Sequence, residues 1–144
     1  EIKSRDGMDI ALISYEKNAR VLQYAGARNP LYLIRDNEVQ VFKASRQSIG
    51  GLYYLKKKMK LVNYENHEIK IQDGDIIYMF SDGYADQFGG PETKKFGYKP
   101  FRDLLLSISD KDMEEQKVIL EEKFNEWRGE KTQIDDIVII GIRF

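Results

Sequence analysis

Apolar residues alternate with polar ones, or form short unbroken runs, through most of the chain, and both patterns are typical of β-strands. Polar links that are rich in Gly, Asn and Asp separate these runs. The predicted strands cover residues 8–15, 21–25, 31–35, 39–43, 68–72, 76–81 and 137–142. Because only short turns join the first four strands, we expect them to form an antiparallel meander.

The pattern changes between residues 98 and 128, where apolar residues recur at intervals of three and four. This spacing predicts a helix over residues 112–127, with Val118 beside its apolar stripe, and a shorter helix over residues 101–107. One face of each helix should pack against a sheet. Together the elements predict an α+β fold with largely antiparallel sheets and flanking helices.

Composition narrows the class of protein. The chain has 144 residues, about the size of one domain, and its 23 basic and 24 acidic residues nearly balance. This balance gives no reason to expect binding to nucleic acid. There is no cysteine, so disulfides and thiolate chemistry are excluded. No apolar run approaches the roughly 20 residues that span a bilayer. We therefore expect a cytoplasmic protein.

The candidate chemistry lies at the ends of two predicted strands. Ser81-Asp82-Gly83 follows a buried apolar run, and Asp135-Asp136 precedes the last strand. If these two strands are antiparallel neighbours, Asp82 and Asp135 meet at one edge of a sheet. Converging carboxylates at such an edge are suitable ligands for hard divalent cations.

Three segments carry a resemblance to a known family. In order and spacing, Phe80–Asp86, Gln133–Ile137 and Tyr24–Tyr32 resemble the SpoIIE-like branch of the metal-dependent, PPM-type Ser/Thr protein phosphatases. The resemblance extends over nearly the whole chain. It implies a β-sandwich with helices on the outer faces, so that the predicted strands and helices would form part of that fold.

The resemblance also implies a reaction and its cofactors. In this family, water held between two Mg²⁺ or Mn²⁺ ions hydrolyses phosphoserine or phosphothreonine, and no protein nucleophile is needed. Asp82 and Asp135 match metal-binding aspartates. Asp136 is a further candidate that either binds the metal or orients a water. Gly83 would let the backbone approach the site closely.

Each of these residues also has a structural interpretation. Asp82 and Gly83 could form an ordinary turn, and Asp86 is better explained as a residue that caps or decorates the next turn or helix. His67, the only histidine, shares strand parity with apolar neighbours and is interpreted as a packing residue. Arg28 most simply shapes a hairpin, with contact to a substrate phosphate as the alternative.

Residues 44–63 and 87–99 are predicted to form two long irregular links, which in compact domains are often functional or mobile. The first contains the basic run Lys56–Lys60. This run is interpreted as a solvated loop, and proximity to a phosphorylated partner is the alternative.

The chain departs from the family pattern at its N-terminal side. Relatives carry further metal-binding aspartates and a Gly-His-Gly signature in segments that would lie before Glu1, and this chain has no Gly-His-Gly. We therefore interpret residues 1–144 as the C-terminal portion of a single SpoIIE-like phosphatase domain that is incomplete at the N terminus. Alone it should be inactive, and it could form a homodimer through exposed sheet edges.

Two hypotheses about function remain open from the sequence. The first is the output portion of a signalling phosphatase that acts on a phosphorylated protein of the STAS-type anti-sigma antagonist class, with a sensor domain upstream in the full-length chain. The second is a noncatalytic interaction or regulatory module that retains the phosphatase-like fold. The sequence before Glu1 would distinguish these hypotheses.

Overall fold

The computed structural model describes residues 7–50 and 63–144. These residues belong to two compact units, and each unit is described by itself. The first contains residues up to Leu31 together with Val41–Asp73, and the second contains Tyr32–Gln40 together with Gly74–Phe144. The basic run Lys56–Lys60 lies outside the described residues.

The first unit is built from antiparallel strands. Its three-stranded sheet has the order β2-β3-β7, formed by β2 (Ile10–Glu16), β3 (Val21–Ala27) and β7 (Asn66–Lys70). Two short strands, β1 (Gly7–Met8) and β6 (Ile49–Gly50), pair separately. The ring of His67 stacks on Tyr24 with 5.6 Å between centroids, as expected for a packing residue.

The second unit contains most of a four-stranded sheet with the order β11-β8-β4-β5. Its strands are β4 (Leu31–Arg35), β5 (Glu38–Phe42), β8 (Ile76–Phe80) and β11 (Ile139–Arg143). The predicted single meander is wrong, because β2 and β3 pair in one sheet whereas β4 and β5 lie in the other. Asp36 and Asn37 form the tight turn between β4 and β5, and both have positive φ, as a type I′ hairpin requires.

An ion pair between a buried carboxylate and a partly buried arginine links two strands of the sheet in the second unit. Arg35, at the end of β4, donates two hydrogen bonds of 2.9 and 2.6 Å to the carboxylate of Asp75 just before β8. Asp75 is almost completely buried, so its charge requires this partner. The hydrogen bond and the charge of Asp75 also raise the pKa of Arg35.

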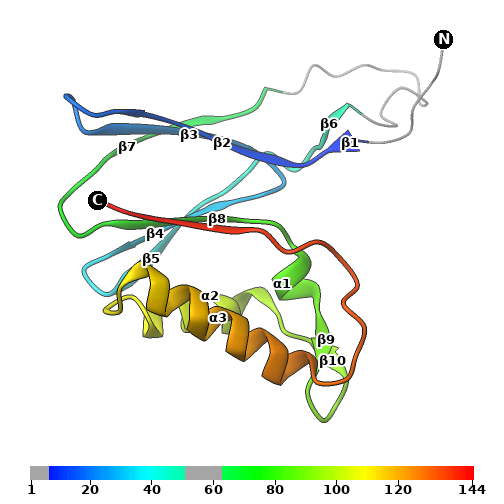
Figure 1. The fold of residues 1–144 in the computed structure, drawn as a ribbon. Coiled ribbons are helices and arrows are strands. Elements are labelled where there is room, and N and C mark those ends of the chain that lie inside the picture. The colour runs from blue at the N-terminus through cyan, green and yellow to red at the C-terminus, as the bar shows by residue number, and fades with distance from the viewer. Residues whose placement is uncertain (1–6, 51–62) are drawn as a thin grey trace, which may run out of the picture. The chain divides into compact units, whose positions relative to one another are not determined.

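The helices of the second unit lie on one side of its sheet (Figure 1). They are α1 (Gly83–Asp86), α2 (Tyr98–Ser107) and α3 (Met113–Arg128), and a short hairpin of β9 (Phe88–Gly89) and β10 (Lys94–Lys95) lies between α1 and α2. The α+β class with antiparallel sheets is therefore confirmed. Among the described residues, no helix is long and apolar enough to span a bilayer.

Helix α3 begins and ends close to the predicted limits. Asp112 accepts a hydrogen bond of 2.8 Å from the Glu115 N–H, and the Glu115 side chain accepts one from the Asp112 N–H, which forms a capping box. The buried face contains Leu120 and Phe124. It also contains Gln116, whose burial was not predicted because the residue is polar. Val118, which was placed beside the apolar stripe, is 52% exposed.

We predict that Phe124→Ala lowers the free energy of unfolding by about 3–5 kcal/mol, because it leaves a cavity where Phe124 packs against Tyr84. Val118→Ala on the exposed face of the same helix should change it by no more than about 0.5 kcal/mol. Urea denaturation of both variants provides the measurement. Equal losses in the two variants would contradict the assignment of the faces.

Candidate metal site

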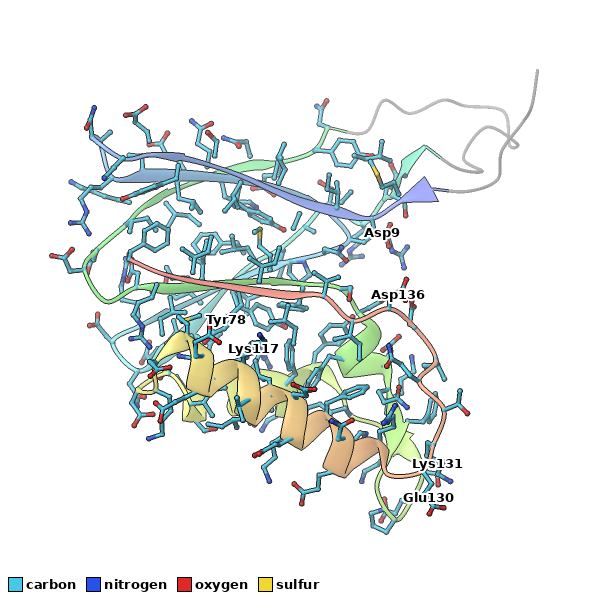
Figure 2. All side chains as sticks on the ribbon, viewed as in Figure 1. Asp9, Tyr78, Lys117, Glu130, Lys131 and Asp136 are labelled. Carbon is cyan, nitrogen blue, oxygen red and sulfur yellow. The ribbon has the colours of Figure 1, made fainter. Side chains whose placement is uncertain are left out.

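The segment that contains Asp82 and the segment that contains Asp135 and Asp136 adjoin neighbouring strands at the same end of the sheet. We call them the two motif segments. Strands β8 and β11 are antiparallel, and Phe80 pairs with Ile139 at the end of the ladder. Asp82 lies two residues beyond β8, and Asp135 and Asp136 lie just before β11. Figure 2 shows Asp136 on the segment that leads into β11. The expected antiparallel pairing of these strands is therefore confirmed. The last strand begins at Ile139, two residues later than predicted.

Ser81 extends the contact between the two segments beyond the last paired residues. Its N–H donates to the Val138 carbonyl over 2.9 Å, and its hydroxyl donates to the Asp136 carbonyl over 2.8 Å. The same hydroxyl oxygen accepts a hydrogen bond of 3.0 Å from the Val138 N–H. Ser81 thus fixes the backbone that carries Asp136. Sequence reasoning missed this role, although a serine directly after a buried strand was a possible signal.

Gly83 lets the segment before β11 pass directly over the start of α1. A Cβ atom at this position would lie 2.4 Å from the Asp136 carbonyl oxygen and 3.1 Å from a side-chain carbon of Ile137. Both contacts are shorter than real Cβ atoms comfortably make, and the first is with backbone. The absence of a side chain at Gly83 is therefore a requirement of the crossing.

Asp82 stands at the beginning of α1 and is exposed, and its side chain does not cap the helix. Tyr84 anchors this short helix to the core. Its ring packs against Phe101 and Phe124, and its hydroxyl donates a hydrogen bond of 2.9 Å to the Leu120 carbonyl in α3. Burial raises the pKa of Tyr84, so its hydroxyl stays protonated and keeps this contact.

Asp135 and Asp136 lie on an exposed link between α3 and β11. The carboxylate of Asp135 accepts a hydrogen bond of 2.7 Å from the Asp136 N–H, and Gln133 donates one of 2.8 Å to the Asp135 carbonyl. These local contacts shape the backbone of the link and leave carboxylate oxygens exposed.

The donor set fits a hard divalent cation. The structure gives the carboxylates of Asp82 and Asp136 neither a hydrogen bond nor an ion pair with any residue it describes, and both are exposed. Carboxylate oxygens are the ligands that Mg²⁺ and Mn²⁺ prefer. Within residues 7–50 and 63–144, no group of three potential ligands is already gathered as a metal site. Asp82, Asp135 and Asp136 can therefore contribute ligands but do not by themselves form a closed cage.

Two other charged candidates, Asp86 and Arg28, have protein partners. Asp86 forms an ion pair of 2.9 Å with Lys95 on β10, in agreement with a role outside the metal site. Arg28 pairs with Asp9 over 3.4 Å in the first unit. This contact supports a structural interpretation of Arg28, which also has positive φ.

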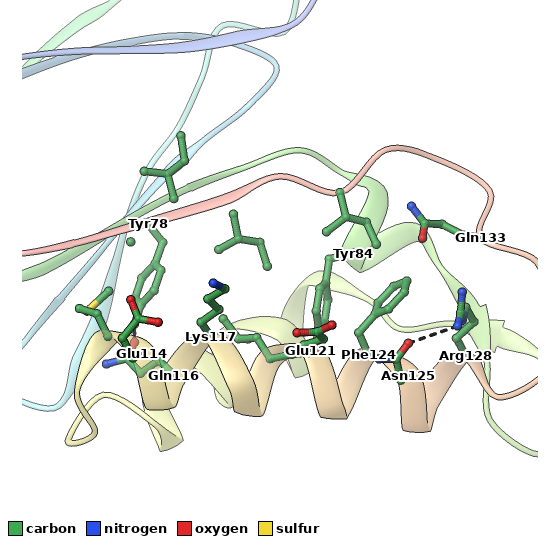
Figure 3. Close-up of a pocket in the computed structure, with 16 residues that line it drawn as sticks. Tyr78, Tyr84, Glu114, Gln116, Lys117, Glu121, Phe124, Asn125, Arg128 and Gln133 are labelled. Atoms are coloured by element: carbon green, nitrogen blue, oxygen red, sulfur yellow. Dashed lines mark hydrogen bonds between the residues drawn. The ribbon is translucent and has the colours of Figure 1, made fainter.

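A groove of about 650 Å³ runs between α3 and β11 (Figure 3). Ile137, Ile139 and Ile140 line one side, and charged α3 residues such as Lys117 and Glu121 line the other. None of Asp82, Asp135 and Asp136 lines it. The groove is a gap between a helix and a sheet, and it is separate from the candidate metal-binding residues.

Comparison with known proteins identifies the family. The model of the SpoIIE family, described as stage II sporulation protein E, matches residues 2–144. The chain belongs to this family and has the fold of the PPM-type phosphatase domains. A comparison with curated protein sequences finds no match.

Several solved structures share the fold. The SiaA-PP2C domain of Pseudomonas aeruginosa is 33% identical with a TM-score of 0.84, and the match covers 94% of this chain and 51% of that chain. The SpoIIE phosphatase domain of Bacillus subtilis, presoaked with Mn, is 15% identical with a TM-score of 0.67, over 94% and 56%. The RsbU and RsbW domains of Rv1364c from Mycobacterium tuberculosis are 17% identical with a TM-score of 0.69, and the match covers 94% of this chain and 35% of that chain. The chain thus spans about half the length of the first two.

We predict that Gly83→Ala separates the two motif segments, because the new Cβ would collide with the Asp136 carbonyl. Amide hydrogen exchange at Ser81 and Val138 should become faster, since these N–H groups bridge the segments. Gly129→Ala is the control. It lies at the start of the same link, where a Cβ meets nothing within 4 Å. Its positive φ would cost stability, but exchange at Ser81 and Val138 should stay slow. Equal effects in both variants would contradict the predicted crossing.

Proposed function

We propose that residues 1–144 are the C-terminal portion of a single phosphatase domain that hydrolyses phosphoserine or phosphothreonine on a signalling protein. One observation carries the proposal: the two acidic motif segments are held together at one end of the β8–β11 pair. Ser81 joins them by hydrogen bonds, and Gly83 leaves room for the close approach of the Asp136 backbone. Membership of the SpoIIE family supports it.

In this proposal Asp82 and Asp135 hold divalent cations, and Asp136 either adds a ligand or orients a water. When bound, two Mn²⁺ or Mg²⁺ ions would supply an activated water and neutralise charge on the phosphoryl group. The protein supplies rigid placement. The Ser81 hydroxyl fixes the Asp136 backbone, and Tyr84 fixes the helix that begins beside Asp82. Because these carboxylates are exposed, cations bound to them would be accessible to a phosphorylated side chain on a folded partner.

For the substrate we propose a phosphorylated protein of the STAS-type anti-sigma antagonist class, and for the full-length protein a cytoplasmic output domain controlled by a sensor upstream. The relative from Mycobacterium tuberculosis combines RsbU and RsbW domains, which supports a signalling role with protein partners. The alternative is a noncatalytic interaction module, which would be favoured if the full-length protein shows no phosphatase activity in the assay described next.

Asp82→Asn and Asp135→Asn, each in the full-length protein, should remove most phosphatase activity and leave the melting temperature almost unchanged. Each substitution takes away a ligand charge on an exposed side chain and disturbs no core packing. Asp86→Asn is the matched control, because it removes only an ion pair with Lys95. The assay is hydrolysis of para-nitrophenyl phosphate and of a phosphoserine peptide with saturating Mn²⁺. Full activity in Asp82→Asn would refute the assignment.

We further expect the 144-residue chain alone to show little or no turnover in the same assay. A two-metal site requires enough oxygen ligands to hold both ions against their repulsion, and the proposed set here is Asp82, Asp135 and Asp136. The full-length protein is the comparison. Robust turnover by the 144-residue chain that is lost in Asp82→Asn would show that these residues suffice.

A further inference from the structure

Gln87 is a polar residue in the core of the second unit. It is the first residue after α1, and none of its surface is exposed. Its side-chain amide donates hydrogen bonds of 2.9 Å to the Phe88 carbonyl and 3.0 Å to the Thr132 carbonyl. The backbone carbonyl of Gln87 accepts hydrogen bonds from the Trp127 indole and the Phe96 N–H. Gln87 thus joins the Asp82 helix to both α3 and the link that follows α3.

The orientation of the Gln87 amide follows from its partners. Both side-chain contacts are with backbone carbonyl oxygens, which only accept hydrogen bonds, so the NH₂ group must face them. The amide oxygen on the other side is buried and has no hydrogen-bond partner among the residues that the structure describes. A methionine of similar volume would avoid this unfavourable burial, but it could not donate to Thr132. The structural use of the glutamine is therefore its NH₂ group.

The link from residue 129 to residue 138 carries Asp135 and Asp136. The side chains of residues 129–136 are exposed, so apolar packing contributes little to its position. Hydrogen bonds to Gln87 at Thr132, and to Ser81 at Asp136 and Val138, attach the link to the segment that follows β8. Asp135 lies between these attachments. Figure 2 shows the link running from Glu130 and Lys131 near the β9–β10 hairpin to Asp136 beside α1.

We propose that Gln87 is a positioning residue for the metal site, and the inference rests on the proposed function. By holding the Thr132 carbonyl, its amide fixes the link on the side of Asp135 away from Ser81. The same residue continues directly from the helix that begins beside Asp82. One buried side chain therefore acts with Ser81 to set where the two acidic segments stand relative to each other. Replacing a direct hydrogen-bond partner of a metal ligand typically changes metal affinity about 10–100-fold, and because Gln87 acts through the Thr132 backbone we expect the lower end of this range.

The test uses Gln87→Met in the full-length protein, with Gln116→Met as the matched control. Gln116 is also a buried glutamine, and its side chain bonds to Tyr78 and to the Lys111 carbonyl, away from the link. Isothermal titration calorimetry measures Mn²⁺ affinity, and thermal unfolding measures stability. Both variants should lose stability. Only Gln87→Met should weaken Mn²⁺ binding, by about 10-fold. Thr132→Ala should bind Mn²⁺ normally, because the contact is with its backbone.

The outcomes separate the inference from the proposed function. If Asp82→Asn abolishes Mn²⁺ binding and Gln87→Met leaves it unchanged, Gln87 has no positioning role although the metal site stands. Equal weakening in Gln87→Met and Gln116→Met would also overturn the inference, because it would reflect general loss of structure. If Asp82→Asn leaves binding intact, the metal site is wrong and the inference fails with it. Should Gln87→Met not fold, Gln87→Asn shortens the amide and carries the same expectation.

Discussion

The antiparallel pairing of β8 and β11 is the constraint on which the candidate site depends. It brings together two segments that are more than fifty residues apart in sequence and ends them on the same side of the sheet. Beyond the last pair, the Ser81 hydroxyl continues the contact as both donor and acceptor. Gly83 then leaves room for the crossing backbone. Displacing either segment would therefore separate the Asp82 and Asp136 backbones.

The acidic residues of the second unit fall into two physical classes. Asp75 is buried and is fully paired with Arg35, so its charge serves the sheet. Asp82 and Asp136 are exposed, and their carboxylates have no protein partner within the described residues. A buried carboxylate without a partner would be too costly to retain, whereas exposed ones at the ends of rigid strands can bind a cation at little cost to the fold.

Much of this arrangement could be predicted from the sequence, because it depends on local patterns. An apolar run predicted β8, the spacing of apolar residues at three and four predicted α3, and the Ser81-Asp82-Gly83 cluster indicated the candidate site. The single meander was wrong because short turns do not reveal when consecutive strands belong to different sheets. The burial of Gln116 on α3 was missed because the polarity of a side chain does not show that the fold supplies it with hydrogen-bond partners. The role of Gln87 depends on a contact with Thr132 that only the folded chain creates.

Anomalous diffraction from crystals of the full-length protein grown with Mn²⁺ tests the metal site most directly, because it locates the ions without an assay of activity. We expect anomalous density beside the carboxylates of Asp82 and Asp135, at the end of the β8–β11 pair where Ser81 bonds to Asp136. Density that is confined to other carboxylates, with Asp82 and Asp135 facing solvent alone, would contradict the assignment of these residues as metal ligands.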